Sequence, residues 1–358
     1  MTFMLNDEQG MLKESARDFF REQAPVSRLR KHRDAKQNGR DPELWREMSA
    51  MGWAGVITPE EFGGAGLGYV ALGAVLEESG RTLVASPLHS SALAGASALM
   101  LAGTDAQKQK WLPKIAAGEV VATVAVDEGA HHAPRKSKLA FGGGKLTGEK
   151  AYVADGHIAD LFVVAGADAL YVLKAGAAGV TRRELVTADS RGAADLKFEA
   201  APAEKMNGGA DVIDAILDRA RIGLAAEMLG TATEAFEITS EYLKTRRQFG
   251  QVIGGFQALQ HRAAKLFTEL ELTRSCVLAA LDALDRNDKR VPEFASLAKA
   301  RACETLHLAS NEMVQLHGGI GMTDEHDAGL YLKRARAAEA LYGGASFHRD
   351  RYASLLGF

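Results

Sequence analysis

Residues 221–264 read RIGLAAEMLGTATEAFEITSEYLKTRRQFGQVIGGFQALQHRAA and set the architecture of the whole chain. The first half places apolar residues at the spacing of one helical face, which predicts a long amphipathic helix. The residues on this face are Leu224, Met228, Leu229, Ala232, Phe236, Ile238 and Tyr242. The basic run from Lys244 to Arg247 indicates the end of this helix, because basic side chains complement the dipole at a helix C-terminus. After Gly254-Gly255, a second amphipathic helix is predicted from near Phe256.

The turn between these two helices carries a second pattern. Arg246, two further residues and Phe249-Gly250-Gln251 are followed by Gln257 and Gln260 on the next helix. Taken alone, the arginines would be an ordinary charged cap. In this order the residues resemble the acyl-CoA dehydrogenase family. The resemblance implies that Arg246 reaches across a subunit interface to the pyrophosphate of a neighbour's FAD, and that Phe249 packs on that cofactor. A guanidinium suits this role because it donates two parallel charge-assisted hydrogen bonds to phosphate oxygens.

Size and composition predict a globular protein of two or three domains, since 358 residues are many for a single core. The net charge of -3 gives no electrostatic reason to expect nucleic acid or an anionic membrane as a partner. The polar N-terminus is not a signal peptide, and the apolar run 88–103 is too short for a membrane span. We therefore expect a cytoplasmic protein in which Cys276 and Cys303 are reduced, buried and inert.

The texture of the sequence predicts an α+β multidomain fold. Residues 1–120 predict an N-terminal helical domain, in which Asn6 caps the first helix and further helices cover about 42–51 and 72–80. Residues 121–207 predict a middle antiparallel β domain, and residues 208–358 predict a C-terminal four-helix bundle. The resemblance implies that this bundle carries the FAD and oligomer interface. The α, β, α order resembles the acyl-CoA dehydrogenase family over the whole chain.

The middle and C-terminal domains are recognised by their separate patterns. Short β-branched runs separated by glycine-rich turns predict strands, and the Gly142–Gly144 cluster predicts a hairpin turn because no helix follows it. These strands are expected at about 120–126, 145–153, 161–165, 169–173 and 196–198. Long amphipathic stretches predict the bundle helices. These helices are expected at about 212–244, 256–286, 292–318 and 325–342.

Two further segments resemble the family. Gly52–Gly55 and Pro59–Gly64 resemble its N-terminal domain, which helps to wall the acyl-chain pocket. Residues 315–323 read QLHGGIGMT, and a glycine pair lets backbone N–H groups approach an anion closely. Read alone, Gly318 would be a helix C-cap. The resemblance implies that Gln315, Gly318 and Gly319 contact the adenosine side of the neighbouring subunit's FAD. A lone histidine in such a motif is usually a hydrogen-bonded structural residue, so we expect no acid–base role for His317.

The reaction of this family sets a chemical requirement. Desaturation of an acyl thioester removes an α-proton while the β-hydrogen leaves as hydride to the flavin. A carboxylate must therefore lie in a dry pocket that raises its pKa toward the working pH. Oriented hydrogen bonds must also stabilise the charge that develops on the thioester carbonyl.

The residues that meet this requirement in the family are missing here. The usual base is the glutamate of a Tyr-Glu-Gly-Thr-Ser segment, which here reads Tyr-Gly-Gly-Ala-Ser, with Gly343 at the position of the base and Ala345 at that of a flavin-contacting threonine. Some relatives carry the base just before the arginine that opens the long helix, where this chain has Ala220 before Arg221. We therefore predict no catalytic residue and no metal ligand, and Arg221 is a candidate for lining the substrate pocket.

Positions that resemble the flavin contacts of the middle domain are altered as well. Where the family has Thr-Glu-Pro and a Gly-Ser-Asp turn, residues 126–132 read VDEGAHH. Where it has Trp-Ile-Thr-Asn, residues 152–155 read YVAD, which lacks the hydroxyl that hydrogen-bonds the flavin edge. The loss is selective, because the residues implied to contact a neighbour's FAD are retained.

This asymmetry predicts a subunit that completes the FAD site of a catalytic paralogue, as in the α2β2 acyl-CoA dehydrogenases that act on steroid-CoA side chains. The resemblance implies an acyl-CoA substrate and an electron-transfer flavoprotein as electron acceptor. One alternative is an active homodimer or homotetramer in which Asp218 or Glu339, each about one helical turn from an empty base position, replaces the base. The other alternative is a flavin-free scaffold or binding protein.

Overall fold

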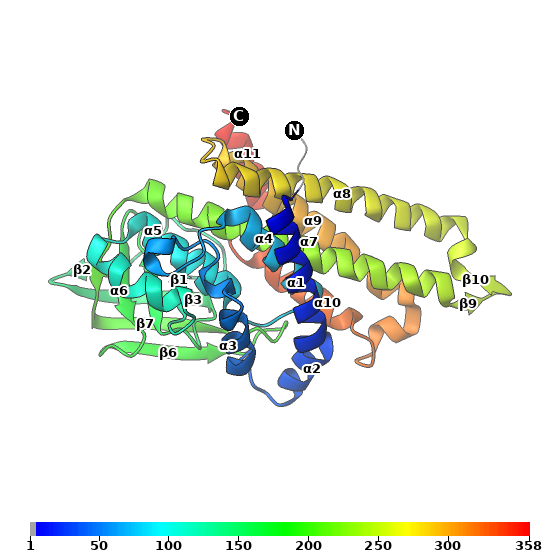
Figure 1. Cartoon of the computed structure of the whole chain (residues 1–358), viewed down its shortest axis with the longest axis horizontal. Coiled ribbons are helices and arrows are strands. Elements are labelled where there is room, and N and C mark those ends of the chain that lie inside the picture. Colours follow the sequence, from blue (N-terminus) through cyan, green and yellow to red (C-terminus); the bar gives the residue numbers. More distant parts are fainter. Residues whose placement is uncertain (1–4) are drawn as a thin grey trace. The chain divides into compact units, whose positions relative to one another are not determined.

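The computed structural model describes residues 5–358 (Figure 1). Its internal contacts divide the chain into two compact units. The helical unit comprises the chain up to Arg28, the segment Gly73–Val84 and the segment Arg221–Phe358. The mixed unit comprises Leu29–Leu72 and Ala85–Ala220. Three helices, α2, α4 and α7, run from one unit into the other.

The helical unit is a bundle around α9, which packs against α8, α10 and α11 (Figure 1). Its elements are α1 Asp7–Gln23, the second parts of α4 Gly68–Arg81 and α7 Ala210–Thr245, β9 Arg247–Gln248, β10 Gln251–Val252, η4 Ile253–Gly255, α8 Gln257–Asp285, α9 Val291–His317, η5 Gly318–Met322, α10 Ala328–Ala340 and α11 Ala345–Leu355. The predicted bundle is confirmed. A fifth C-terminal helix, α11, was not expected, because the weak apolar pattern after Ala345 does not identify a buried face.

Helices α4 and α7 approach each other closely through glycines within the helical unit. A Cβ atom added at Gly80 would overlap with the carbonyl oxygen of Glu227, and one added at Gly230 would overlap with that of Glu77. Charged side chains then hold α1 and α8 to the same surface, because Glu77 pairs with both Lys13 at 2.6 Å and Arg274 at 2.8 Å. The pKa of the buried Glu77 carboxyl is lowered: burial acts to raise it, and the two neighbouring cations outweigh that effect.

The mixed unit contains two four-stranded sheets with helices around them. Its elements are the second part of α2 Val26–Asp34, α3 Pro42–Ala50, η1 Trp53–Gly55, η2 Glu60–Phe62, the π-helix η3 Leu88–Gly95, α5 Ala96–Ala102, α6 Asp105–Ala116, β1 Ala122–Ala125, β2 Ala140–Gly142, β3 Lys145–Ala154, β4 Leu161–Ala165, β5 Leu170–Lys174, β6 Val180–Leu185, β7 Ala193–Pro202 and β8 Glu204–Lys205. The first parts of α4 and α7 also belong to it.

The strand order is β1-β4-β5-β8 in one sheet and β2-β3-β7-β6 in the other. The second sheet is antiparallel throughout, with Glu149 opposite Lys197, and the Gly143-Gly144 turn of its first hairpin has positive φ as expected for glycine. The first sheet differs from the prediction in one pair, because β1 and β4 run parallel. Buried β-branched runs fit either direction, so the sequence pattern could not identify this pair.

Other differences from the sequence analysis follow from weak local patterns. Helix α2 and strands β2, β6 and β8 were not expected, since they are short or largely exposed. The apolar run from Leu88 begins as a buried π-helix before it continues as α5. Cys303 is buried as predicted, but Cys276 is only half-buried on α8, so the expectation of a buried thiol is wrong there. Neither cysteine forms a disulfide.

Candidate functional site

The residues predicted to contact FAD lie at one end of the helical bundle, where α7 meets the β9–β10 hairpin (Figure 1). A small apolar cluster of Leu243, Ile253 and Leu316 joins α7, η4 and α9 at this end. The hairpin register is fixed by Gln251 opposite Gln248. Since α9 contributes Leu316 to the cluster, its C-terminal glycine pair lies on the same end of the bundle as the hairpin.

Arg246 and Phe249, the two residues predicted from the sequence at this hairpin, have exposed side chains. Phe249 has φ of 54° and is 88% exposed, with its ring 6.1 Å from that of Phe256. The backbone N–H of Arg246 donates to the Tyr242 carbonyl at 2.9 Å. Its guanidinium is exposed and has no hydrogen-bond or ion-pair partner among residues 5–358. An exposed aromatic ring and an unpaired guanidinium at one hairpin are suited to a ligand supplied from outside this chain.

The glycine pair after α9 forms an open backbone surface. Gly318 has φ of 63°, which favours glycine, and a Cβ added at Gly318 or Gly319 would meet no atom within 4 Å. Gln315, one turn earlier, is exposed. These positions leave room for a ligand to approach the backbone closely.

His317 is a structural residue in this geometry. Its Nδ1 lies 2.7 Å from the Met313 carbonyl oxygen, so the ring donates there. The ring lies between Tyr242 and His326, with centroid distances of 4.4 Å and 4.2 Å. Burial lowers the pKa of His317, which favours the neutral form of the ring. A proton-transfer role is not indicated.

The turn that carries Gly343 has a backbone conformation unfavourable for any side chain. Gly343 has φ of 101°, and an added Cβ would lie 2.5 Å from Cδ1 of Phe347. Tyr342 before it also has positive φ, at 58°. Ala345 then begins α11 with a methyl group in place of a hydroxyl. This turn therefore offers no proton acceptor and disfavours the introduction of one.

Basic side chains hold this turn from inside the helical unit. Arg221 Nε donates to the Tyr342 carbonyl at 3.3 Å, and His348 Nε2 donates to the same oxygen at 3.1 Å. Lys299 on α9 donates from Nζ to the carbonyl of Gly343 at 3.0 Å. All three side chains are at most 1% exposed. Burial, together with neighbouring Arg221 and Lys299, lowers the pKa of His348 to about 2.

Lys299 has a second set of contacts that explains its burial. Its Nζ also donates to the Ala338 carbonyl at 3.0 Å, near the end of α10, and lies 3.2 Å from Cys303 Sγ. Burial lowers the pKa of Lys299, and the nearby Cys303 opposes this shift. The sequence analysis missed Lys299, His348 and Phe347. A charged residue inside an apolar helical pattern is the one signal that could have identified Lys299.

The two carboxylates considered as displaced bases have different surroundings. Glu339 is bound by Arg336 at 2.9 Å and by His307 at 3.1 Å on the surface of the helical unit. Its carboxylate is therefore held by two basic side chains of the same unit. Asp218 is buried in the part of α7 that belongs to the mixed unit. In that unit Ala220 carries a carbonyl that accepts a hydrogen bond from His89 Nε2 at 2.8 Å.

In the segment 126–139 of the mixed unit, two carboxylates accept hydrogen bonds from nearby groups of the chain. Asp127 accepts from the backbone N–H of Ala133 at 2.9 Å and pairs with His132 Nδ1 at 2.9 Å. Glu128 accepts from Ser137 at 2.5 Å and from the buried Lys150 at 3.0 Å. The carboxylates of Asp127 and Glu128 are therefore engaged within the chain itself.

Residues 152–155 are also held by hydrogen bonds within the chain. The Tyr152 side chain is 61% exposed, and its backbone N–H donates to Asp195 at 3.0 Å. Ala154 is the last residue of β3 and provides no side-chain donor. Buried Asp155 accepts from Ser90 Oγ at 2.6 Å.

Neither a metal site nor a membrane-spanning helix is found in the part of the chain that the structure describes. Within residues 5–358, no cluster of three or more His, Cys, Asp or Glu side chains is placed to hold a metal ion. No helix in this range is both long and apolar enough to cross a membrane.

Comparison with known proteins defines the class of this chain. Residues 6–119 match the family described as "Acyl-CoA dehydrogenase, N-terminal domain", and residues 207–356 match "Acyl-CoA dehydrogenase, C-terminal domain". The chain is 34% identical over 337 residues to acyl-CoA dehydrogenase IpdE2 of Mycobacterium tuberculosis, covering 94% of this chain and 93% of that protein.

Solved structures agree over nearly the full length. A chain of a Tcur3481-Tcur3483 steroid ACAD variant superimposes with a TM-score of 0.89 at 32% identity, over 98% of both chains. A chain of the ChsE4-ChsE5 complex from Mycobacterium tuberculosis superimposes with a TM-score of 0.89 at 26% identity, over 99% of both chains. The chain belongs to the acyl-CoA dehydrogenase family, a family of flavoprotein oxidoreductases whose cofactor is FAD.

Proposed function

We propose that this chain is a non-catalytic subunit of an FAD-dependent acyl-CoA dehydrogenase and completes the FAD site of a catalytic paralogue. The observation that carries the proposal is the turn at Gly343, which has no proton acceptor, positive φ and an aromatic ring where a side chain would lie. Ala220, at the second base position of the family, has no ionisable group either. Desaturation requires a carboxylate base, so the base must come from another subunit.

The hairpin supports the second half of the proposal, in which the retained contacts serve a partner's cofactor. Arg246 would bind the pyrophosphate, Phe249 would pack on the cofactor, and Gln315, Gly318 and Gly319 would contact its adenosine side. The unpaired guanidinium and the open glycine backbone fit an anionic nucleotide. When bound, FAD supplies the hydride acceptor for the β-hydrogen of the acyl thioester.

Three buried basic side chains would keep water out of the turn at Tyr342 and Gly343, because each donates to a carbonyl oxygen of that turn. They are Arg221, Lys299 and His348. Arg221 would also line what remains of a substrate pocket. Such a subunit would share an α2β2 assembly with its paralogue, and electrons would pass to an electron-transfer flavoprotein. We propose the domain boundaries 1–120, 121–207 and 208–358 for this subunit.

The substrate class follows from the relatives. The structural neighbour named as a steroid ACAD, at 32% identity over 98% of both chains, supports a CoA thioester derived from a steroid as substrate. The neighbour named as the ChsE4-ChsE5 complex supports a partnership between two related chains.

The test is co-expression of this chain with a family paralogue from the same genome, followed by purification and measurement of flavin absorbance. The proposal expects one FAD per pair of chains and turnover of an acyl-CoA by the complex. It expects no turnover by this chain purified alone. Full flavin content and normal turnover by the isolated chain would support an active homo-oligomer with Asp218 or Glu339 as base, and would overturn the proposal. A complex that binds no flavin would support a scaffold instead.

The role of Arg246 is tested in the same complex. Arg246→Ala should lower the FAD content or raise the FAD dissociation constant by about 10-fold or more, because a charge-assisted bidentate pair is lost. The matched control is Arg247→Ala, which removes the same charge from the adjacent, equally exposed position. Equal effects of the two substitutions would indicate a general electrostatic contribution and would contradict the assignment of Arg246.

A further inference from the structure

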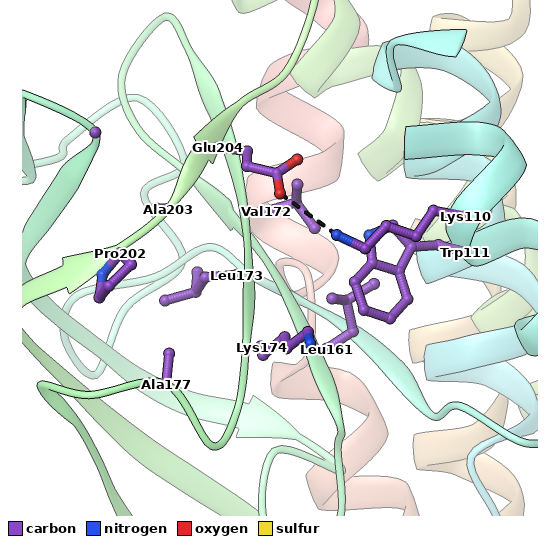
Figure 2. Close-up of a pocket in the computed structure, with 11 residues that line it drawn as sticks. Lys110, Trp111, Leu161, Val172, Leu173, Lys174, Ala177, Pro202, Ala203 and Glu204 are labelled. Carbon is purple, nitrogen blue, oxygen red and sulfur yellow. Dashed lines mark ion pairs between the residues drawn. The ribbon is translucent and has the colours of Figure 1, made fainter. Parts of the chain in front are cut away.

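A surface cavity of about 250 Å³ lies wholly within the mixed unit, between α6 and the first sheet (Figure 2). Its walls are apolar over most of their extent. They are formed by Trp111 of α6, Leu161 of β4, Val172 and Leu173 of β5, and Pro202 at the end of β7. None of the residues assigned above to FAD or to the vacated base position lines this cavity.

The cavity exists because the sheet ends early on this side. Strand β8 has only two residues, and its pairing with β5 covers Tyr171 and Val172 alone. Beyond Val172, no strand is paired with β5 on the β8 side, so Leu173 and Lys174 border open space. The small side chains of Ala177 and Ala203 leave that space unfilled.

One rim of the cavity is electrostatically satisfied. Glu204 pairs with Lys110, whose Nζ lies 3.6 Å from Oε1 of Glu204 (Figure 2). Glu204 also accepts from Gln107 Nε2 at 3.2 Å. Lys110 also lies over the Trp111 ring at 4.9 Å from the centroid. These contacts hold Trp111, which is only 8% exposed, as a fixed wall.

The other rim carries a cation without a partner. Lys174 lines the cavity, and among residues 5–358 its ammonium group has no hydrogen-bond or ion-pair partner. Lys110 and Glu204 neutralise each other, so the cavity presents a net charge of one positive unit above an apolar floor. A ligand that matches it carries one negative charge on a hydrocarbon body.

The size of the cavity limits the ligand. One water occupies roughly 30 Å³ of liquid, so 250 Å³ corresponds to a ligand of roughly eight to ten non-hydrogen atoms. We propose that this cavity binds a small monocarboxylate with an aliphatic body, with its carboxylate on Lys174 and its chain between Trp111 and Leu173. The site is separate from the flavin contacts and does not depend on the proposed partner role.

The test uses octanoate as the probe and the full chain labelled with 5-fluorotryptophan. The chain has three tryptophans, Trp45, Trp53 and Trp111, and a Trp111→Phe variant assigns the third fluorine resonance. Octanoate should shift the Trp111 resonance saturably, with a dissociation constant on the order of 1 mM for so small a ligand. 1-Octanol and octylamine, which have the same chain without the carboxylate, should bind several-fold more weakly.

Variants identify the cation. Lys174→Gln should weaken octanoate binding by about fivefold, the upper end for an exposed ion pair, and leave 1-octanol unaffected. Lys174→Glu should abolish the octanoate shift. The control, Lys136→Gln, removes an exposed lysine of the same unit that does not line the cavity, and should change nothing. An unmoved Trp111 resonance at 10-fold excess over the expected dissociation constant would overturn the proposal. So would equal binding of the three probes, or unchanged octanoate affinity in Lys174→Gln.

Discussion

At the scale of single residues, the basic side chains of the candidate site fall into two groups, one buried and one exposed. Three basic side chains, Arg221, Lys299 and His348, lie inside the helical unit and donate to the carbonyl oxygens of one turn. Arg246 lies at the surface with no partner among the described residues. Buried cations require compensation by acceptors at short range, which the turn supplies. The exposed guanidinium has no such requirement and is available to a ligand.

The first residue-scale prediction concerns the vacated base position. Gly343→Glu is expected not to restore dehydrogenation to the isolated chain, as measured by reduction of a dye acceptor with an acyl-CoA substrate. The new side chain would begin in a left-handed backbone and displace Phe347. Nearby Arg221 and Lys299 would also lower the pKa of the carboxyl and weaken it as a base.

The same substitution should reduce the free energy of unfolding by about 1–3 kcal/mol, from backbone strain and overpacking. Gly343→Ala, which introduces the strain with a smaller side chain, serves as the comparison and should cost less. Restored turnover in Gly343→Glu would show that the turn tolerates a base and that its loss is not structural.

The second residue-scale prediction concerns pH. His348 has a folded-state pKa of about 2, well below the ordinary value of 6.5, so the unfolded chain binds an extra proton between these values. Stability therefore rises with pH through this window and is lost as pH falls below about 6.5. His348→Gln, which keeps a donor for the Tyr342 carbonyl, should remove on the order of 1 kcal/mol of pH dependence per pH unit between about 6 and 4.

Urea unfolding at several pH values measures this difference between the wild type and His348→Gln. Exposed His131→Gln is the control and should keep the slope of the wild type. Parallel stability curves for wild type and His348→Gln would show that His348 becomes protonated without unfolding.

At the scale of elements, the α4–α7 contact depends on two glycines whose Cβ positions are occupied by backbone carbonyls of the facing helix. Close approach of this kind increases dispersion contacts between the helices, and partly buried ion pairs join α1 and α8 to Glu77 beside it. The contact joins an N-terminal helix to the bundle within the helical unit, although the two segments lie more than 100 residues apart in sequence.

Gly230→Ala should therefore destabilise the chain by about 1–3 kcal/mol, because the methyl group overlaps with the Glu77 carbonyl and forces the helices apart. Gly329→Ala on α10 is the matched control, since a Cβ there meets no atom within 4 Å. That substitution should be neutral or stabilise by up to about 1 kcal/mol through helix propensity. Thermal unfolding of the two variants measures these changes in stability. Equal changes for Gly230→Ala and Gly329→Ala would contradict the argument that Gly230 is required for close helix packing.

Much of the element content could be predicted from the sequence, and the exceptions have physical causes. The long helices α7, α8 and α9 have strong apolar periodicity, so their ends were predicted to within a few residues. Helix α11 and strand β6 are largely exposed, and the parallel direction of β1 depends on tertiary pairing that no local pattern records. In the candidate site, Arg246 and Gly343 were predicted from the resemblance to the family. The contacts of Lys299 and Phe347 join distant segments, so no local pattern records them.

At the scale of the whole molecule, the proposed role implies that FAD stabilises the complex of two subunits but not this subunit alone. Residues that bind FAD only from outside the chain contribute nothing to the stability of the isolated subunit, while a ligand bound across an interface stabilises the complex. In the loop 126–139, the carboxylates of Asp127 and Glu128 accept hydrogen bonds from the loop itself, which supports a unit that folds without flavin.

Removal of FAD from the purified complex should therefore lower the apparent melting temperature of the complex or promote its dissociation. Addition of FAD to the isolated chain should leave its melting temperature unchanged. Differential scanning fluorimetry and size-exclusion chromatography, with and without flavin, measure both effects. A rise of several degrees in the melting temperature of the isolated chain with FAD would show that this subunit holds its own flavin.

The backbone at Gly343 also bears on how such a subunit could change over generations. A single substitution that reinstates a carboxylate there meets a left-handed backbone and the Phe347 ring at once. Recovery of an autonomous enzyme would need coordinated replacements, each harmful when it arises first. If the two subunits share one reaction as proposed, the geometry at Gly343 makes the loss of the base hard to reverse and keeps the two gene products dependent on each other.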